Sequence, residues 1–283
     1  MAALPFELIE VILKNLYTNP FSKPACLAAC SLVCRGWRPI AQALFFSEVS
    51  IPDGPNRPPV QPGQDDLYPW STENPNLQLY VRRLWIRSLQ ESRIGKLASS
   101  LPNLEQLVIF DPSKLDGNET IPSRIMDSLY ENIHSNHLTS LCISNVVDFP
   151  VHTFYLCSSL RELKIRGTSF EGLRADTHTF EHEESLDYAR SLDPDPSPRP
   201  RLQSLHLSIS SPGSVGIFLW LLTPGCAFDL SELKTLHCLD RTDAIACFSR
   251  VVRLVDFVSS SLEDLMVDPP TWCSCPPFLC RFS

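Results

Sequence analysis

The sequence predicts a small helical unit followed by an irregular α/β solenoid with a parallel strand face. Two patterns lead to this fold class. Apolar residues recur at helical spacing in the first part of the chain, which we assign to residues 1–51, and a short pattern Leu-x-x-Leu-x-apolar recurs along residues 79–268. Between them, residues 52–78 are rich in proline and have no periodicity, which is typical of an extended linker or surface loop.

The first predicted helix has a wide apolar face. It is expected to begin at Leu4-Pro5, because a first helical position does not need the N–H group that proline lacks. Glu10 and Lys14 lie on the other face, at the spacing of a helical ion pair. The apolar face is formed by Leu8, Ile9, Ile12 and Leu16.

Two further helices complete the predicted unit. The second covers about residues 25–33 and carries Leu27, and Pro20 and Pro24 mark the connection before it as a loop. The third follows Gly36, and Trp37 is expected mainly to support the core. A unit of this size has too little core to bury all of its apolar side chains, so we expect a partner to cover the excess.

The recurring pattern predicts a stack of short strands. The last three residues of each copy alternate between inward and outward positions, as they do in a strand. The copies start at Val81, Leu104, Leu138, Leu160, Leu202, Leu233 and Leu262. Helical spacing is found between copies at residues 92–99, 123–133, 214–222 and 243–258. Alternating helices and strands imply parallel strands with the helices packed outside them.

Two segments depart from this pattern. Residues 170–200 are acidic and then proline-rich, with one short helix expected near residues 183–191. A solvated connection and an acidic contact for a basic partner are the two interpretations of this insertion. Residues 269–283 form a tail with too few apolar residues to cap a repeat array. The last repeat is therefore expected to be poorly covered, or the sequence stops short of the domain end.

Composition argues against several classes of protein. A formal net charge of −8 disfavours nucleic acid as the main partner, because phosphate binding requires a basic patch. No apolar run approaches the roughly 18–20 residues that a membrane span needs, and Glu7 and Glu10 interrupt any signal-peptide core. The sequence contains 11 cysteines, an odd number, and we expect their thiols to be reduced, in the cytoplasm or nucleus.

No group of residues predicts catalysis or a cofactor. His178 and His182 have metal-ligand spacing but lack the adjacent glutamate of a zinc protease, and Cys273-x-Cys275 lacks the second cysteine pair of a zinc ribbon. No glycine-rich phosphate loop is present in the sequence. We therefore expect a non-catalytic protein without metal or cofactor, and a hydrolase or metal enzyme hidden in the repeats is the alternative.

The opening residues resemble an F-box. The resemblance rests on Leu4-Pro5 at the start, Val33-Cys34-x-x-Trp37 at the end, and the apolar helix between them. Its form is similar to that of F-box proteins of mushroom-forming fungi. The later pattern resembles irregular leucine-rich repeats, although the usual Asn or Cys after each strand is largely missing.

These resemblances imply a substrate receptor for ubiquitination. F-box proteins bind the Skp adaptor of Skp–cullin–F-box ubiquitin ligases, and the repeats would hold an unknown target protein. The implied adaptor contacts are Leu4, Pro5, Leu8, Ile9, Ile12, Leu16, Leu27, Val33, Cys34 and Trp37. The outward-facing candidates for target contacts are Glu105, Gln106, Arg161, Glu162, Lys164, Gln203 and His206. An interaction scaffold that works outside ubiquitin ligases remains the alternative.

Overall fold

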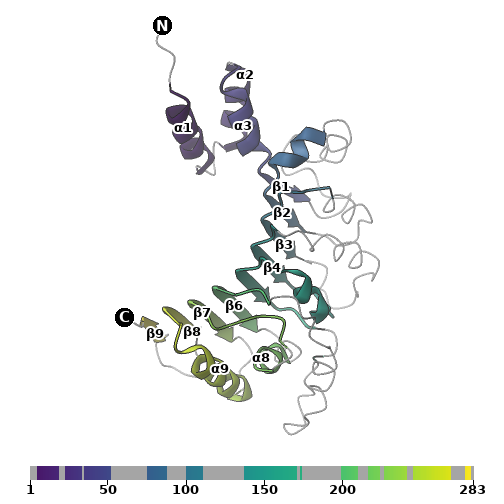
Figure 1. Cartoon of the computed structure of the whole chain (residues 1–283), viewed down its shortest axis with the longest axis vertical. Coiled ribbons are helices and arrows are strands. Elements are labelled where there is room, and N and C mark those ends of the chain that lie inside the picture. Colours follow the sequence, from purple (N-terminus) through teal and green to yellow (C-terminus); the bar gives the residue numbers. More distant parts are fainter. Residues whose placement is uncertain are drawn as a thin grey trace.

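Three helices precede an open sheet whose strands follow one another in sequence order (Figure 1). This arrangement confirms the predicted mixed helical and α/β class. The computed structural model describes residues 5–18, 23–33, 35–51, 75–87, 100–110, 137–170, 173, 199–209, 216–223, 226–240, 245–268 and 278–281.

The helical unit consists of α1 (Phe6–Thr18), α2 (Lys23–Val33) and α3 (Arg38–Phe45). The carbonyl of Pro5 accepts hydrogen bonds from the backbone N–H groups of Leu8 and Ile9, at 3.1 and 3.2 Å. The expectation that Pro24 lies in a loop was wrong, because α2 begins one residue before it. In the first turn of a helix the N–H group that proline lacks has no intrahelical partner to lose.

The core of the helical unit is small. Its buried residues in the described part of the chain are Ile9, Leu13, Leu27 and Ala41. Cys30, Trp37, Ile40 and Leu44 are half-buried and pack against this group. On the polar side of α1, Lys14 and Glu10 form the predicted ion pair at 2.7 Å.

The sheet contains nine strands in the described residues. These are β1 (Glu48–Ile51), β2 (Arg83–Ile86), β3 (Gln106–Phe110), β4 (Ser140–Ser144), β5 (Glu162–Arg166), β6 (Ser204–Ile209), β7 (Thr235–Asp240), β8 (Asp264–Asp268) and β9 (Phe278–Arg281). Strands β1 to β8 pair in parallel, and β9 pairs with β8 in the antiparallel direction. Each of the seven predicted copies of the repeat pattern supplies one strand, β2 to β8.

Both ends of the sheet extend past the predicted repeats. Residues 48–51 were assigned to the helical unit, but β1 pairs with β2, and Val49 and Ile51 are buried in the sheet core. At the other end, β9 lies in the predicted tail and covers the backbone edge of β8. Edge pairing needs only an extended backbone, so the low apolar content of the tail did not reveal it.

Helices and short turns connect some of the strands. The predicted helices after β6 and β7 are present as α8 (Gly216–Leu221) and α9 (Ile245–Val258). Two 3-10 helices were not predicted, namely η1 (Pro75–Tyr80), which crosses the end of the assigned linker, and η3 (Val151–Leu156) between β4 and β5. The helices predicted at residues 92–99, 123–133 and 183–191 lie outside the described residues.

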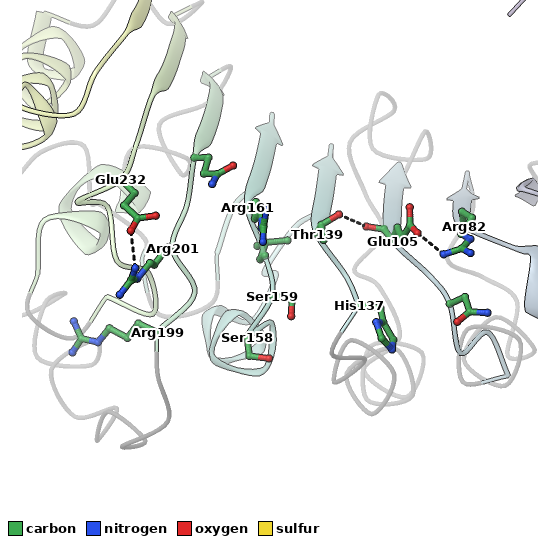
Figure 2. Close-up of a pocket in the computed structure, with 13 residues that line it drawn as sticks. Arg82, Glu105, His137, Thr139, Ser158, Ser159, Arg161, Arg199, Arg201 and Glu232 are labelled. Carbon is green, nitrogen blue, oxygen red and sulfur yellow. Dashed lines mark hydrogen bonds and ion pairs between the residues drawn. The ribbon is translucent and has the colours of Figure 1, made fainter. Parts of the chain in front are cut away.

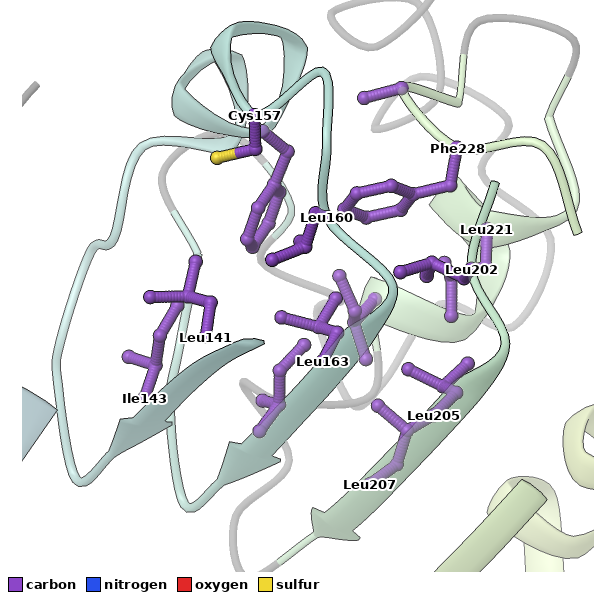
Figure 3. Close-up of a cluster of buried hydrophobic side chains, with 14 of the residues drawn as sticks. Leu141, Ile143, Cys157, Leu160, Leu163, Leu202, Leu205, Leu207, Leu221 and Phe228 are labelled. Carbon is purple, nitrogen blue, oxygen red and sulfur yellow. The ribbon is translucent and has the colours of Figure 1, made fainter. Parts of the chain in front are cut away.

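The sheet buries parallel rows of aliphatic side chains. In-register neighbours such as Leu141, Leu163 and Leu205 form one row, and Ile143, Ile165 and Leu207 form the next (Figure 3). An aromatic cluster covers these rows and consists of Phe149, Phe154, Phe170, Trp220 and Phe228. Since one face of the strands is filled in this way, the alternate side chains and the two ends of the strands remain available for binding.

Candidate protein-interaction surfaces

An exposed apolar surface lies on α1. Leu8, Val11 and Ile12 are 52%, 54% and 41% exposed, and their spacing places them on one side of the helix. We call these three residues the α1 surface. On α2, Leu32 is a further exposed apolar residue. Large apolar side chains concentrated on so small a unit are typical of a face that a partner covers.

The predicted adaptor contacts divide into exposed and buried groups. Pro5, Leu8 and Ile12 are exposed, whereas Ile9 and Leu27 are buried in the unit and support the surface rather than forming it. Trp37 is half-buried against the same core, as expected of a supporting residue. Leu4 and Cys34, and the side chains of Leu16 and Val33, lie outside the described residues.

A polar network lies on the outward strand face and includes the predicted target contacts Glu162 and Lys164. The hydroxyl of Ser140 donates to Oε2 of Glu162 at 2.6 Å, and Nζ of Lys164 lies 2.7 Å from Oε1 of the same carboxylate. Burial alone would raise the pKa of Glu162, but these hydrogen bonds outweigh it and hold the pKa below its ordinary value. Gln106 lies in register with Ser140 on the adjoining strand.

Two histidines continue this network across β6 and β7. The ring centroids of His206 and His237 are 4.4 Å apart, in an edge-to-face arrangement. Nε2 of His206 lies 2.9 Å from the Ser204 hydroxyl, and Nε2 of His237 lies 3.2 Å from Asp264. Burial, followed by the neighbouring His237 and Lys164, lowers the pKa of His206 to about 4. His206 is therefore neutral at physiological pH.

The remaining predicted target contacts lie at the N-terminal edge of the sheet. Glu105, Arg161 and Gln203 each precede a strand by one residue and line a hollow of about 820 Å³ (Figure 2). The sequence therefore predicted one contact set, but the structure separates it into an edge group and a face group. The reason is strand alternation, which turns residues at successive positions in different directions.

Two arginines that line the same hollow were missed by sequence reasoning. Arg199 and Arg201 were assigned to the end of the proline-rich insertion and to the start of a repeat, without a role. The available signal was their i, i+2 spacing directly before Leu202, because such residues share one side of an extended chain. Arg201 also forms a parallel bridge with Asp229, which fixes its backbone beside the sheet.

No group of three potential metal ligands occurs among the described residues. His178, His182, Cys273 and Cys275 lie outside them. Burial raises the pKa of Cys157 and Cys226 to about 12, so these thiols remain protonated at neutral pH. None of the helices in the described ranges combines the length and apolar character that crossing a bilayer requires.

Comparisons with protein-family models and with curated proteins find no match to this chain.

Proposed function

We propose that this chain is an F-box protein with irregular leucine-rich repeats, which acts as the substrate-recognition subunit of a Skp–cullin–F-box ubiquitin ligase. The observation that carries the proposal is the α1 surface, where Leu8 and Ile12 of the F-box-like pattern face solvent. Burying a side chain of this kind contributes roughly 1.5–3 kcal/mol, so a groove on the Skp adaptor would stabilise the unit by covering it.

The sheet supports the second half of the proposal. One strand per copy of the pattern, stacked in sequence order, is the arrangement expected of leucine-rich repeats. Its outward positions carry the polar network around Glu162 and His206, and its N-terminal edge carries Arg161. These two surfaces are the candidate binding sites for a target protein.

The proposed mechanism is proximity rather than chemistry by this chain. A target bound to the repeats and an adaptor bound to the α1 surface would meet the ubiquitin-conjugating enzyme at a raised effective concentration. The proposal requires no cofactor and places the protein in the cytoplasm or nucleus, where such ligases work. An interaction scaffold outside the ligase would use the same surfaces without recruiting cullin.

The test is co-purification of the full chain with the Skp adaptor. The variant Leu8→Asp with Ile12→Asp should lose the adaptor, because a lone buried charge costs enough free energy to abolish a ~micromolar complex. Val252→Asp is the matched control, since Val252 on α9 is 41% exposed, the same fraction as Ile12. This control should retain the adaptor.

Two outcomes would contradict the proposal. Absence of adaptor binding by the wild-type chain rejects the F-box assignment, and equal binding by the double aspartate variant rejects the α1 surface as the contact. Far-ultraviolet circular dichroism of each variant checks that the sheet remains folded. Cullin retained together with the adaptor favours the ligase over the scaffold.

A further inference from the structure

A row of outward side chains crosses the sheet at the C-terminal ends of the strands from β2 to β6. Its members occupy equivalent register positions and are Arg87, Phe110, Ser144, Arg166 and Ser208. Arg87 directly follows β2, and its N–H group donates to the Ile51 carbonyl at 3.2 Å, so the parallel pairing still reaches it. Alternation turns these side chains away from the core. We call them the Arg87–Ser208 row.

The row carries two guanidinium groups without a counter-charge. The side chains of Arg87 and Arg166 are exposed. Neither of them forms an ion pair or a side-chain hydrogen bond with any residue that the structure describes. Two positive charges are therefore available on one face of a chain whose net charge is −8. Such a local field attracts negatively charged groups.

The carboxylates of the same face lie far from the row. In the described part of β1 to β5 they are Glu48 and Glu162. Each lies beside another cation, since Nζ of Lys164 is 2.7 Å from Oε1 of Glu162 and Arg83 is the register partner of Glu48. Both carboxylates precede the row by four residues, roughly 13 Å along a strand. This distance exceeds the Debye length of about 8 Å at physiological ionic strength, so they weaken the positive field at the row only slightly.

Apolar side chains lie between the two arginines. Phe110 on β3 is half-buried and is the row's neighbour of Arg87. Val108, two residues earlier on the same strand, is 6% exposed, and its register partner Trp85 is half-buried. The middle of the row therefore offers an aromatic contact to an apolar side chain.

Hydroxyl groups flank the second arginine. Ser144 on β4 and Ser208 on β6 are the register partners of Arg166. The Ser144 hydroxyl contacts Sγ of Cys142 at 3.8 Å, and because sulfur is a weak partner, a bound anion can replace it. The backbone here is ordered, since the Arg166 carbonyl accepts from the Asn145 N–H at 2.8 Å. This end of the row suits an oxyanion.

The spacing of the arginines fits an extended chain. Arg87 and Arg166 are three strand steps apart, which corresponds to roughly 14 Å. An extended chain that runs across the strands covers this distance in about four residues. Its side chains at positions i, i+2 and i+4 point to one side, so anionic groups at i and i+4 reach the arginines while the side chain at i+2 lies over Phe110.

We infer that the Arg87–Ser208 row binds an extended segment of a partner polypeptide with two anionic side chains four residues apart and an apolar side chain midway between them. The anionic groups, carboxylate or phosphate, accept hydrogen bonds from Arg87 and Arg166, whose planar guanidinium groups suit both. The apolar side chain packs on Phe110. This inference rests on the proposed function only in naming the segment as the target's recognition signal, since the binding itself needs no adaptor.

Fluorescence anisotropy with the purified full chain tests the inference. The probe is a short labelled peptide with glutamates at positions i and i+4 and leucine at i+2. A second peptide carries phosphoserines in place of the glutamates, and a third carries glutamines. A fourth keeps the composition of the first but places the two glutamates side by side. The first two, or the phosphorylated peptide alone, should bind, and this difference identifies which oxyanion is used. Binding should weaken strongly at about 1 M salt, where the Debye length is about 3 Å.

Variants locate the contact. Arg166→Glu and Arg87→Glu should each weaken binding at least about tenfold, the loss expected for charged hydrogen bonds. Arg253→Glu is the matched control, because Arg253 is also exposed but lies on α9, away from the row. Phe110→Ala should reduce the preference for leucine over alanine at position i+2. This ratio of affinities does not depend on the fraction of the variant that is folded.

The inference fails if the wild-type chain binds neither anionic peptide, or if the glutamine peptide or the peptide with adjacent glutamates binds as tightly as they do. It also fails if the Arg166→Glu variant is folded by circular dichroism and binds like the wild type. Adaptor co-purification is measured on the same samples. Peptide binding without adaptor binding rejects the F-box proposal alone, and adaptor binding without peptide binding rejects the row alone.

Discussion

The helical unit and the sheet bury their apolar residues to very different extents. In the helical unit the buried core of the described residues consists of Ile9, Leu13, Leu27 and Ala41, while the α1 surface faces solvent. In the sheet a single core runs from Val49 on β1 to Leu265 on β8. A small unit buries a smaller fraction of its surface, whereas each stacked strand covers the apolar row of its neighbour.

This difference suggests two modes of recognition in one chain. The α1 surface consists of exposed apolar side chains, so the binding of a partner to it should depend little on salt concentration. The sheet has already buried its apolar rows and offers charged groups at its edge and on its outward face. Binding there should depend strongly on ionic strength, because opposite charges near a surface are screened.

The largest expected effect is at the sheet core. Phe154 is fully buried, with its ring centroid 5.2 to 5.6 Å from those of Phe149, Trp220 and Phe228. Phe154→Ala should lower the free energy of unfolding by about 3–5 kcal/mol, through lost burial and a residual cavity. Urea denaturation followed by circular dichroism measures it. Phe257→Ala, at an exposed phenylalanine, is the control, and an equal loss there would contradict the assignment of the core.

A local effect is expected in the helical unit. Leu13 is fully buried, and Leu13→Ala should cost about 3 kcal/mol. Because this core is separate from that of the sheet, amide hydrogen exchange should accelerate in α1, α2 and α3 but not in β4 to β7. Accelerated exchange throughout the sheet would show that the two regions unfold as one cooperative unit.

The smallest expected effect is the pH dependence of the strand face. The pKa of His206 is lowered from its ordinary value of 6.5 to about 4, so the unfolded chain binds the proton more tightly than the folded one. The contribution of this neutral ring is complete above pH 6.5 and is lost as the pH falls toward 4. The loss should be smaller than those of the core variants, because the ring is only half-buried.

Denaturant titrations between about pH 7 and pH 5 measure this dependence. In the variant His206→Gln, the free energy of unfolding should fall less steeply with pH than in the wild type. This pH window lies above most of the titration of Glu162. The pKa of Glu162 is lowered in the folded chain, so its contribution to stability is lost only as the pH falls below the ordinary pKa of 4.5. Identical slopes in the two proteins would show that the pKa of His206 is not lowered in the folded chain.

Local sequence patterns predicted much of the fold. The seven strands from β2 to β8 were located because alternation assigns every second side chain to the core, as Leu163 and Ile165 show on β5. Helix α9 was located by its apolar spacing. The edge strands β1 and β9 were not predicted. β1 alternates, with Val49 and Ile51 buried, but its four residues were assigned to the helical unit. The pairing of β9 depends on the neighbouring backbone of β8.

The sequence by itself determined where the seven strands from β2 to β8 form, that the opening helices carry more apolar residues than they can bury, and that the chain is acidic overall. Only the tertiary structure decided which of those apolar residues face solvent. The burial of Ile9 and the exposure of Leu8 depend on which side of α1 packs against α2 and α3. It also brought Arg161 beside Arg199 and Arg201. Parallel stacking places residues that are distant in sequence about one strand spacing apart, roughly 4.8 Å, and no local pattern encodes that proximity.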